Sequence, residues 1–207
     1  MRDFIDKLNK LVELADEAKI AIALAEAYNT KGLSFLGPHN EVRNALFHVI
    51  EMIKVKDEMN KYDNEFGVAC FHFKRARFDA YELLCIDCIK YVEDLLVDYN
   101  HEAINIAFPA YYTEIRKTAM EIRMKLAEIK SKKNLIKQSD EDLFEFFFEQ
   151  ANILIEYVKK INEHIPDIIK IQKKKKKKKR KELLFNIGIA IVIAVVFFIL
   201  GIYVKGN

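Results

Sequence analysis

LLFNIGIAIVIAVVFFILGIYV, residues 183–204, is the most apolar stretch of this sequence and contains no charged residue. As an α-helix these 22 residues would be about 33 Å long, enough to cross a hydrocarbon core of about 30 Å. Every face of the helix would be apolar, which argues against a core helix of the amphipathic kind found elsewhere in the chain. We therefore predict one transmembrane helix over residues 183–204.

A block of basic residues precedes this stretch, whereas only Lys205 follows it closely. Lys and Arg are enriched on the cytoplasmic side of membrane helices, so we predict a single-pass protein of the cell inner membrane whose N-terminal domain is cytosolic. Each cation near an anionic leaflet contributes about 1 kcal/mol, which makes the lipid bilayer the predicted partner of the block. The membrane-surface residues are Lys173, Lys174, Lys175, Lys176, Lys177, Lys178, Lys179, Arg180 and Lys181.

The rest of the sequence predicts an all-α domain. It has only six glycines and three prolines, and its apolar residues recur at spacings of three and four. We predict helices over about 3–28, 41–60 and 64–99, and a fourth after Pro109. A fifth helix begins at a capping box formed by Ser139 and Asp142, and Pro166 ends or kinks it. The predicted fold is a bundle of about five helices over residues 1–172, a polybasic segment over 173–182 and one C-terminal transmembrane helix over 183–204.

Charge and cysteine content exclude several kinds of protein. The net charge is +3, and outside the basic block the chain is acidic, so it has no general attraction for nucleic acid. Cys70, Cys85 and Cys88 are an odd number of cysteines, which predicts reduced thiols in the cytosol. Cys85 and Cys88 have C-x-x-C spacing but no second pair, which favours packing over zinc binding. Motifs of nucleotide-binding proteins, zinc proteases and serine hydrolases are missing, and we expect no metal and no cofactor.

Residues 40–50, NEVRNALFHVI, contain the candidate catalytic residues Arg43, Asn44 and His48. On a helix Asn44 and His48 lie within about 40° of each other, but Arg43 lies about 140° from His48. Two copies that face each other across a two-fold axis would bring the three residue types together. The alternative is that His48 is a partly buried structural residue and Arg43 pairs with a surface carboxylate.

The Arg-x4-His pattern of Arg43, Asn44 and His48 resembles the signature of the HEPN superfamily of small helical domains. Residues 72–82, HFKRARFDAYE, resemble a segment of its bacterial relatives, and the two segments together cover residues 40–98. The resemblance implies metal-independent RNA cleavage by a dimer. With a membrane helix added, the chain is similar to the small membrane accessory proteins of type VI-B CRISPR systems, which implies antiphage defence and a CRISPR effector as partner.

The resemblance also implies roles for individual residues. His48 would be the general acid or base at a ribose 2′-hydroxyl, Arg43 would brace the phosphate, and Asn44 would orient the histidine or the substrate. The side chains of residues 72–82 either form a salt-bridged surface or subunit contact, or bind RNA. The residues in question there are His72, Lys74, Arg75 and Arg77.

Two functions of other classes also fit the sequence. In the first, a non-enzymatic homo-oligomer, a dimer or a larger ring, perturbs the bilayer through residues 183–204 in a pore-like manner, in defence or in a stress response. In the second, the chain is a tail-anchored tethering protein, because a lysine run before a C-terminal span also occurs in SNAREs. Against tethering, the fifth predicted helix has no sustained heptad pattern that reaches the membrane segment.

Overall fold

The computed structural model describes the backbone of residues 2–29, 32, 35–131 and 141–205, and the side chains among them except at 130–131, 141–142 and 197–205. Over these residues the fold is helical and contains no strand, which confirms the all-α class. The elements are α1 (Arg2–Ala27), α2 (Leu36–Lys54), α3 (Met59–Asp98), α4 (His101–Ala107), the π-helical turn η1 (Tyr111–Ile115), α5 (Arg116–Ser131) and α6 (Glu141–Lys205).

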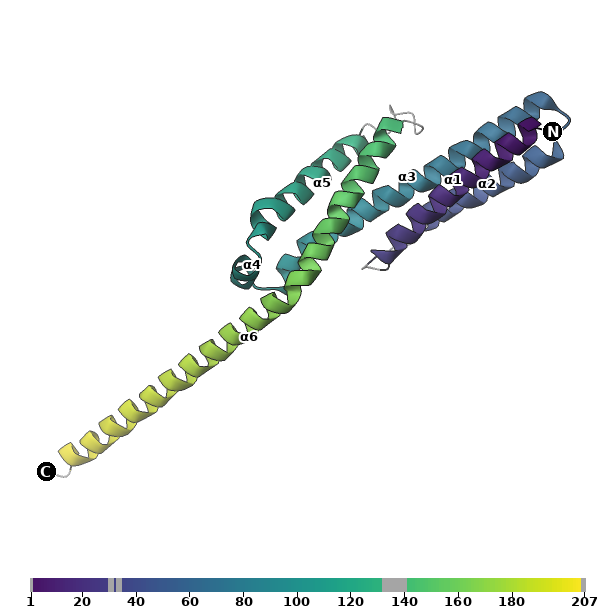
Figure 1. The fold of residues 1–207 in the computed structure, drawn as a ribbon. Helices are drawn as coiled ribbons and strands as arrows, with labels where there is room; N and C mark the ends of the chain where they lie inside the picture. The colour runs from purple at the N-terminus through teal and green to yellow at the C-terminus, as the bar shows by residue number, and fades with distance from the viewer. Residues whose placement is uncertain (1, 30–31, 33–34, 132–140, 206–207) are drawn as a thin grey trace.

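The first helices form a bundle in which α1 and α2 pack along the N-terminal half of α3 (Figure 1). Small residues let the helices approach closely, because Ala18, Ala45 and Ala69 are fully buried where the three helices meet. Larger side chains fill the remaining space of this core, among them Leu11, Leu14, Met52, Tyr62 and Phe73. The bundle fixes which faces of α2 and α3 meet.

The C-terminal half of α3 belongs to a second core, which it shares with α4, α5 and the first part of α6 (Figure 1). Tyr111 is fully buried there, and its hydroxyl donates a hydrogen bond to the carbonyl oxygen of Val92 at 2.8 Å. The phenylalanine-rich stretch at the start of α6 also packs here. Phe147 is buried and meets Phe78 edge to face, with ring centroids 4.7 Å apart.

The structure corrects the predicted division of the C-terminal half. The fifth predicted helix and the C-terminal helix are one continuous helix, α6, and Pro166 lies inside it. The ribbon bends where α6 leaves the body, and the remainder of the helix projects away from the body (Figure 1). We call this remainder, residues 169–205, the stalk. Ile168 is the last buried side chain of α6 among those described. Over the part of the chain that the structure describes, no helix combines the length and apolar character needed to cross a membrane.

Other boundaries differ by a turn or more. The helix predicted from residue 41 begins at Leu36, because Pro38 lies in its first turn, where a backbone N–H has no partner to lose. The short helix α4 was not predicted separately; Asn100 caps it by accepting hydrogen bonds from the N–H groups of Glu102 and Ala103. Ser139, the side chain of Asp142 and the side chains of residues 197–204 lie outside the described residues.

Candidate functional site

Two histidines from neighbouring helices stack where α2 and α3 pack together. The imidazoles of His48 on α2 and His72 on α3 have ring centroids 5.3 Å apart and planes 12° from parallel. His48 lies between Ala45 and Met52, whose burial against α3 turns this side of α2 toward that helix. The structure thus brings together two residues that were predicted to belong to separate groups.

Each histidine is held by a glutamate of the opposite helix. Nδ1 of His48 lies 2.6 Å from Oε2 of Glu65, and Nδ1 of His72 lies 2.6 Å from Oε2 of Glu41. A carboxylate only accepts hydrogen bonds, so each Nδ1 carries a proton and donates it, and each Nε2 is left for other partners. The side chains of His48 and His72 are 24% and 19% exposed, so solvent reaches the pair.

Neither glutamate was predicted as a site residue, although the sequence carries a signal for both. Glu41 and His48 are seven residues apart on α2, and Glu65 and His72 are seven apart on α3. Seven residues are nearly two helical turns, so each pair lies on one face of its helix. When two such helices run antiparallel, each glutamate meets the histidine of the other helix. The equal spacing was visible in the sequence, but the pairing of α2 with α3 was not.

The predicted catalytic residues of α2 do not come together within one copy. Arg43 is exposed and forms no ion pair within the described residues, whereas Asn44 and His48 are partly buried. This agrees with the helical angles, which place Arg43 on a different side of α2 from His48. Any contact of Arg43 with the imidazole pair would have to come from a second copy.

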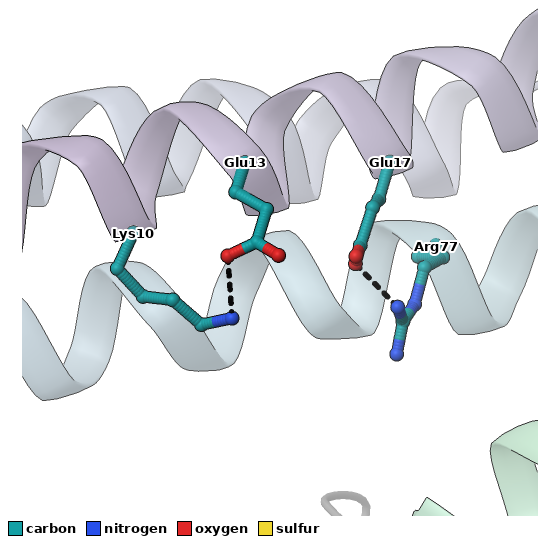
Figure 2. Close-up of polar contacts among 4 residues, drawn as sticks. All are labelled: Lys10, Glu13, Glu17 and Arg77. Atoms are coloured by element: carbon teal, nitrogen blue, oxygen red, sulfur yellow. Dashed lines mark hydrogen bonds and ion pairs between the residues drawn. The ribbon is translucent and has the colours of Figure 1, made fainter.

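The basic residues of the segment 72–82 make contacts within the helical body. The guanidinium of Arg75 pairs with Asp79 one turn later on α3, with 2.9 Å between Nε and Oδ1. Arg77 forms an ion pair with Glu17 of α1, and Figure 2 shows the two side chains reaching toward each other across the helices. Lys74 is partly buried and also has a partner. These contacts favour the salt-bridged surface over the grip on RNA.

The basic block lies on the stalk part of α6 and is mostly exposed. Lys175 forms an ion pair with Glu102 of α4. The hydrogen bond from the Lys175 ammonium holds the pKa of the Glu102 carboxyl below its usual value. Lys178 reaches Glu182 one turn later, with 3.9 Å between Nζ and Oε1. The ion pair between Lys175 and Glu102 joins the start of the stalk to α4 in the body.

No group of three or more His, Cys, Asp or Glu side chains within the described ranges is arranged to hold a metal ion. Cys85 and Cys88 are buried in the second core, and their removal from water raises both thiol pKa values, that of Cys88 to about 12. Thiols of that kind stay protonated at neutral pH, so these two cysteines are packing residues.

No family model matches the chain, and no curated protein or solved structure matches it. The resemblance to the HEPN superfamily therefore stays a prediction.

Proposed function

We propose that α6 anchors this protein in the cell inner membrane in a single pass, with the helical body in the cytosol. The continuity of α6 carries the proposal. The helix packs in the body as far as Ile168 and then continues through the basic block into the apolar residues 183–204. Leu183, Phe185 and Val192 on the stalk are 60%, 69% and 63% exposed, so no described part of the body covers them.

The free energy of transfer supports lipid as the surroundings of this stretch. Residues 183–204 contain three Leu, six Ile, three Phe and four Val. Each of these contributes roughly −0.3 to −0.6 kcal/mol at the centre of a membrane helix, which gives on the order of −5 to −10 kcal/mol for the stretch. Asn186 is the one strongly polar side chain within it, and it lies next to the basic end, where it reaches the headgroup region.

Alkaline carbonate extraction of cell membranes tests the anchor. Carbonate strips peripheral proteins and leaves membrane-spanning ones in the pellet. The full chain should stay in the pellet, and the matched control, a chain that ends at residue 182 and keeps the whole basic block, should move to the supernatant. If carbonate released both proteins, the block alone would account for membrane binding and α6 would not span the bilayer.

As the activity of the anchored protein we propose metal-independent RNA cleavage centred on His48, in antiphage defence or a stress response. The bond from Nδ1 of His48 to Glu65 supports this, because it leaves Nε2 to exchange a proton with a ribose 2′-hydroxyl. His72 supplies a second imidazole beside it. One imidazole would accept the 2′-hydroxyl proton, and the other, protonated, would donate a proton to the departing 5′ oxygen.

The activity test compares histidine variants of the full-length protein in detergent, with single-stranded RNA and a chelator present. His48→Ala and His72→Ala should each lower the cleavage rate at least about 100-fold, the usual contribution of a general acid or base. His101→Ala is the matched control, because His101 is an exposed histidine of α4 whose partner is Tyr112. Undiminished cleavage by His48→Ala would remove the enzyme proposal.

A second function is a non-enzymatic oligomer that perturbs the bilayer through the exposed apolar residues of α6, and the charge around the two imidazoles counts against RNA as their partner. The carboxylates of Glu41 and Glu65 flank the two imidazoles, and carboxylates repel an RNA backbone. In this case the full chain should release dye from liposomes of anionic lipid, His48→Ala should release it equally, and the chain that ends at residue 182 should release none. Intact liposomes in the presence of the full chain would contradict this function.

A further inference from the structure

One face of α2 is apolar and exposed to solvent. Leu46, Phe47, Ile50 and Ile53 are 51%, 58%, 53% and 46% exposed. Leu46, Ile50 and Ile53 follow one another at spacings of four and three along the helix, and Phe47 lies beside them, three residues before Ile50. Four large apolar side chains on one helical face are more than the scattered apolar residues of an ordinary surface. A stripe with this spacing is typical of a helix that packs against another helix.

The position of α2 excludes the protein's own membrane as the cover for this stripe. The α1–α3 bundle lies at the end of the body opposite to the stalk, and the stalk leads away from it (Figure 1). A bilayer that holds residues 183–204 therefore does not reach α2. The cover has to be protein.

The apolar area of the stripe is too small to hold a freely diffusing protein, which favours a partner kept close by a second attachment. The four side chains of the stripe are each about half exposed, so together they offer a smaller apolar area than a whole interface. A stable interface between free proteins needs about 800 Å² on each side. A second copy anchored in the same membrane meets this condition, because anchoring raises the effective concentration of one copy around the other.

We propose that two copies of this chain pair in parallel through Leu46, Ile50 and Ile53 of α2. The proposal rests on the membrane anchor proposed above, since two chains that enter one bilayer from the same side are related by a two-fold axis perpendicular to it. In the view of Figure 1 the axes of the stalk and of α2 are similarly inclined, with opposite chain directions, and in the proposed pair the two-fold axis runs alongside α2. Leu46, Ile50 and Ile53 then each meet the same residue of the second copy.

The residue types of the stripe agree with a parallel pair. In heptad positions Ile50 is an a residue, and Leu46 and Ile53 are d residues, so the stripe supplies the apolar a and d positions of a parallel coiled coil. Arg43 occupies the preceding a position. A charged residue there fixes the register of the two helices and lowers the stability of the pair. The pairing also places Arg43 beside Arg43 of the second copy rather than beside the imidazole pair.

Disulfide cross-linking in native membranes tests the arrangement with the full chain. Leu46→Cys and Ile53→Cys, each expressed alone, should form covalent dimers on oxidation, because parallel pairing brings identical residues together. An antiparallel pair would give the opposite pattern. The two cysteines of one kind would then be about 10 Å apart along the axis, beyond the reach of a disulfide, and only a mixture of the two variants would cross-link.

Two controls separate this proposal from the anchor. Val12→Cys replaces an apolar residue of α1 that is 61% exposed, and it should give no more dimer than the wild-type chain with its native cysteines. Removal of residues 183–204 should lower the cross-linked fraction of Leu46→Cys at least about tenfold. A chain that resists carbonate extraction but cross-links at neither position would overturn the pairing and leave the anchor standing. A chain that carbonate extracts, and whose cross-linking survives removal of 183–204, would overturn the anchor and show that the pairing does not depend on it.

Discussion

Asp87 is fully buried in the second core, and neither of its carboxyl oxygens has a hydrogen-bond partner among the described residues. Removal from water raises the pKa of this carboxyl, and the charge of Lys90 partly opposes the effect. A carboxyl whose pKa is higher in the folded state binds protons more tightly there. Asp87 therefore lowers stability above its unfolded-state pKa of about 4, and the loss is relieved as the pH falls.

Asp87→Asn should raise the free energy of unfolding by about 1 kcal/mol at pH 7, because it removes the buried charge and keeps the shape of the side chain. The gain should shrink as the pH falls toward the pKa of the folded Asp87, where the wild-type carboxyl is neutral too. Thermal unfolding of the detergent-solubilised full chain, followed by circular dichroism at several pH values, measures the difference. A variant less stable than the wild type at every pH would contradict this account of Asp87.

At the scale of elements, Arg77 joins three helices. It is on α3, its guanidinium pairs with Glu17 of α1, and the guanidinium carbon lies 3.5 Å from the ring centroid of Phe144 on α6. The Arg77 side chain is only 11% exposed, so both contacts are made largely out of water. Arg77 therefore connects the α1–α3 bundle to the helix that leads into the stalk.

Arg77→Ala should lower the free energy of unfolding by about 1–3 kcal/mol, because it removes the ion pair and the ring contact together. The matched control is Lys10→Ala, which breaks the exposed pair between Lys10 and Glu13 within α1 (Figure 2) and should change stability by less than about 0.5 kcal/mol. Urea unfolding of both variants in the same detergent gives the comparison. Equal effects of the two substitutions would show that Arg77 does not join the helices.

Local pattern predicted the elements better than their connections. The helices predicted over 3–28 and 64–99 correspond to α1 and α3. Pro38 misled the prediction of one boundary, because a proline is accepted in a first helical turn. Pro166 was predicted to end or kink its helix, and α6 continues through it. His48 was identified from its motif, but Glu65 and Glu41 could be assigned only once α2 and α3 were known to pack together. Such contacts depend on tertiary structure, which periodicity does not encode.

At the scale of the whole molecule, α3 connects two cores, and the stalk starts from the second of them (Figure 1). The imidazole pair and the exposed stripe of α2 both belong to the α1–α3 bundle, at the end remote from the stalk. If α6 spans the bilayer, both features face the cytosol away from the lipid, where RNA and a second copy can reach them. The membrane anchor is therefore the claim on which the other proposals depend.

Labelling of single cysteines with a membrane-impermeant maleimide tests that claim most directly. Lys205→Cys follows the apolar stretch, and Lys10→Cys is an exposed position of the body. In intact spheroplasts the reagent should label Lys205→Cys, whereas Lys10→Cys should react only after lysis. Labelling of both cysteines from the same side of the membrane, or recovery of the full chain in the soluble fraction, would contradict a membrane-spanning α6.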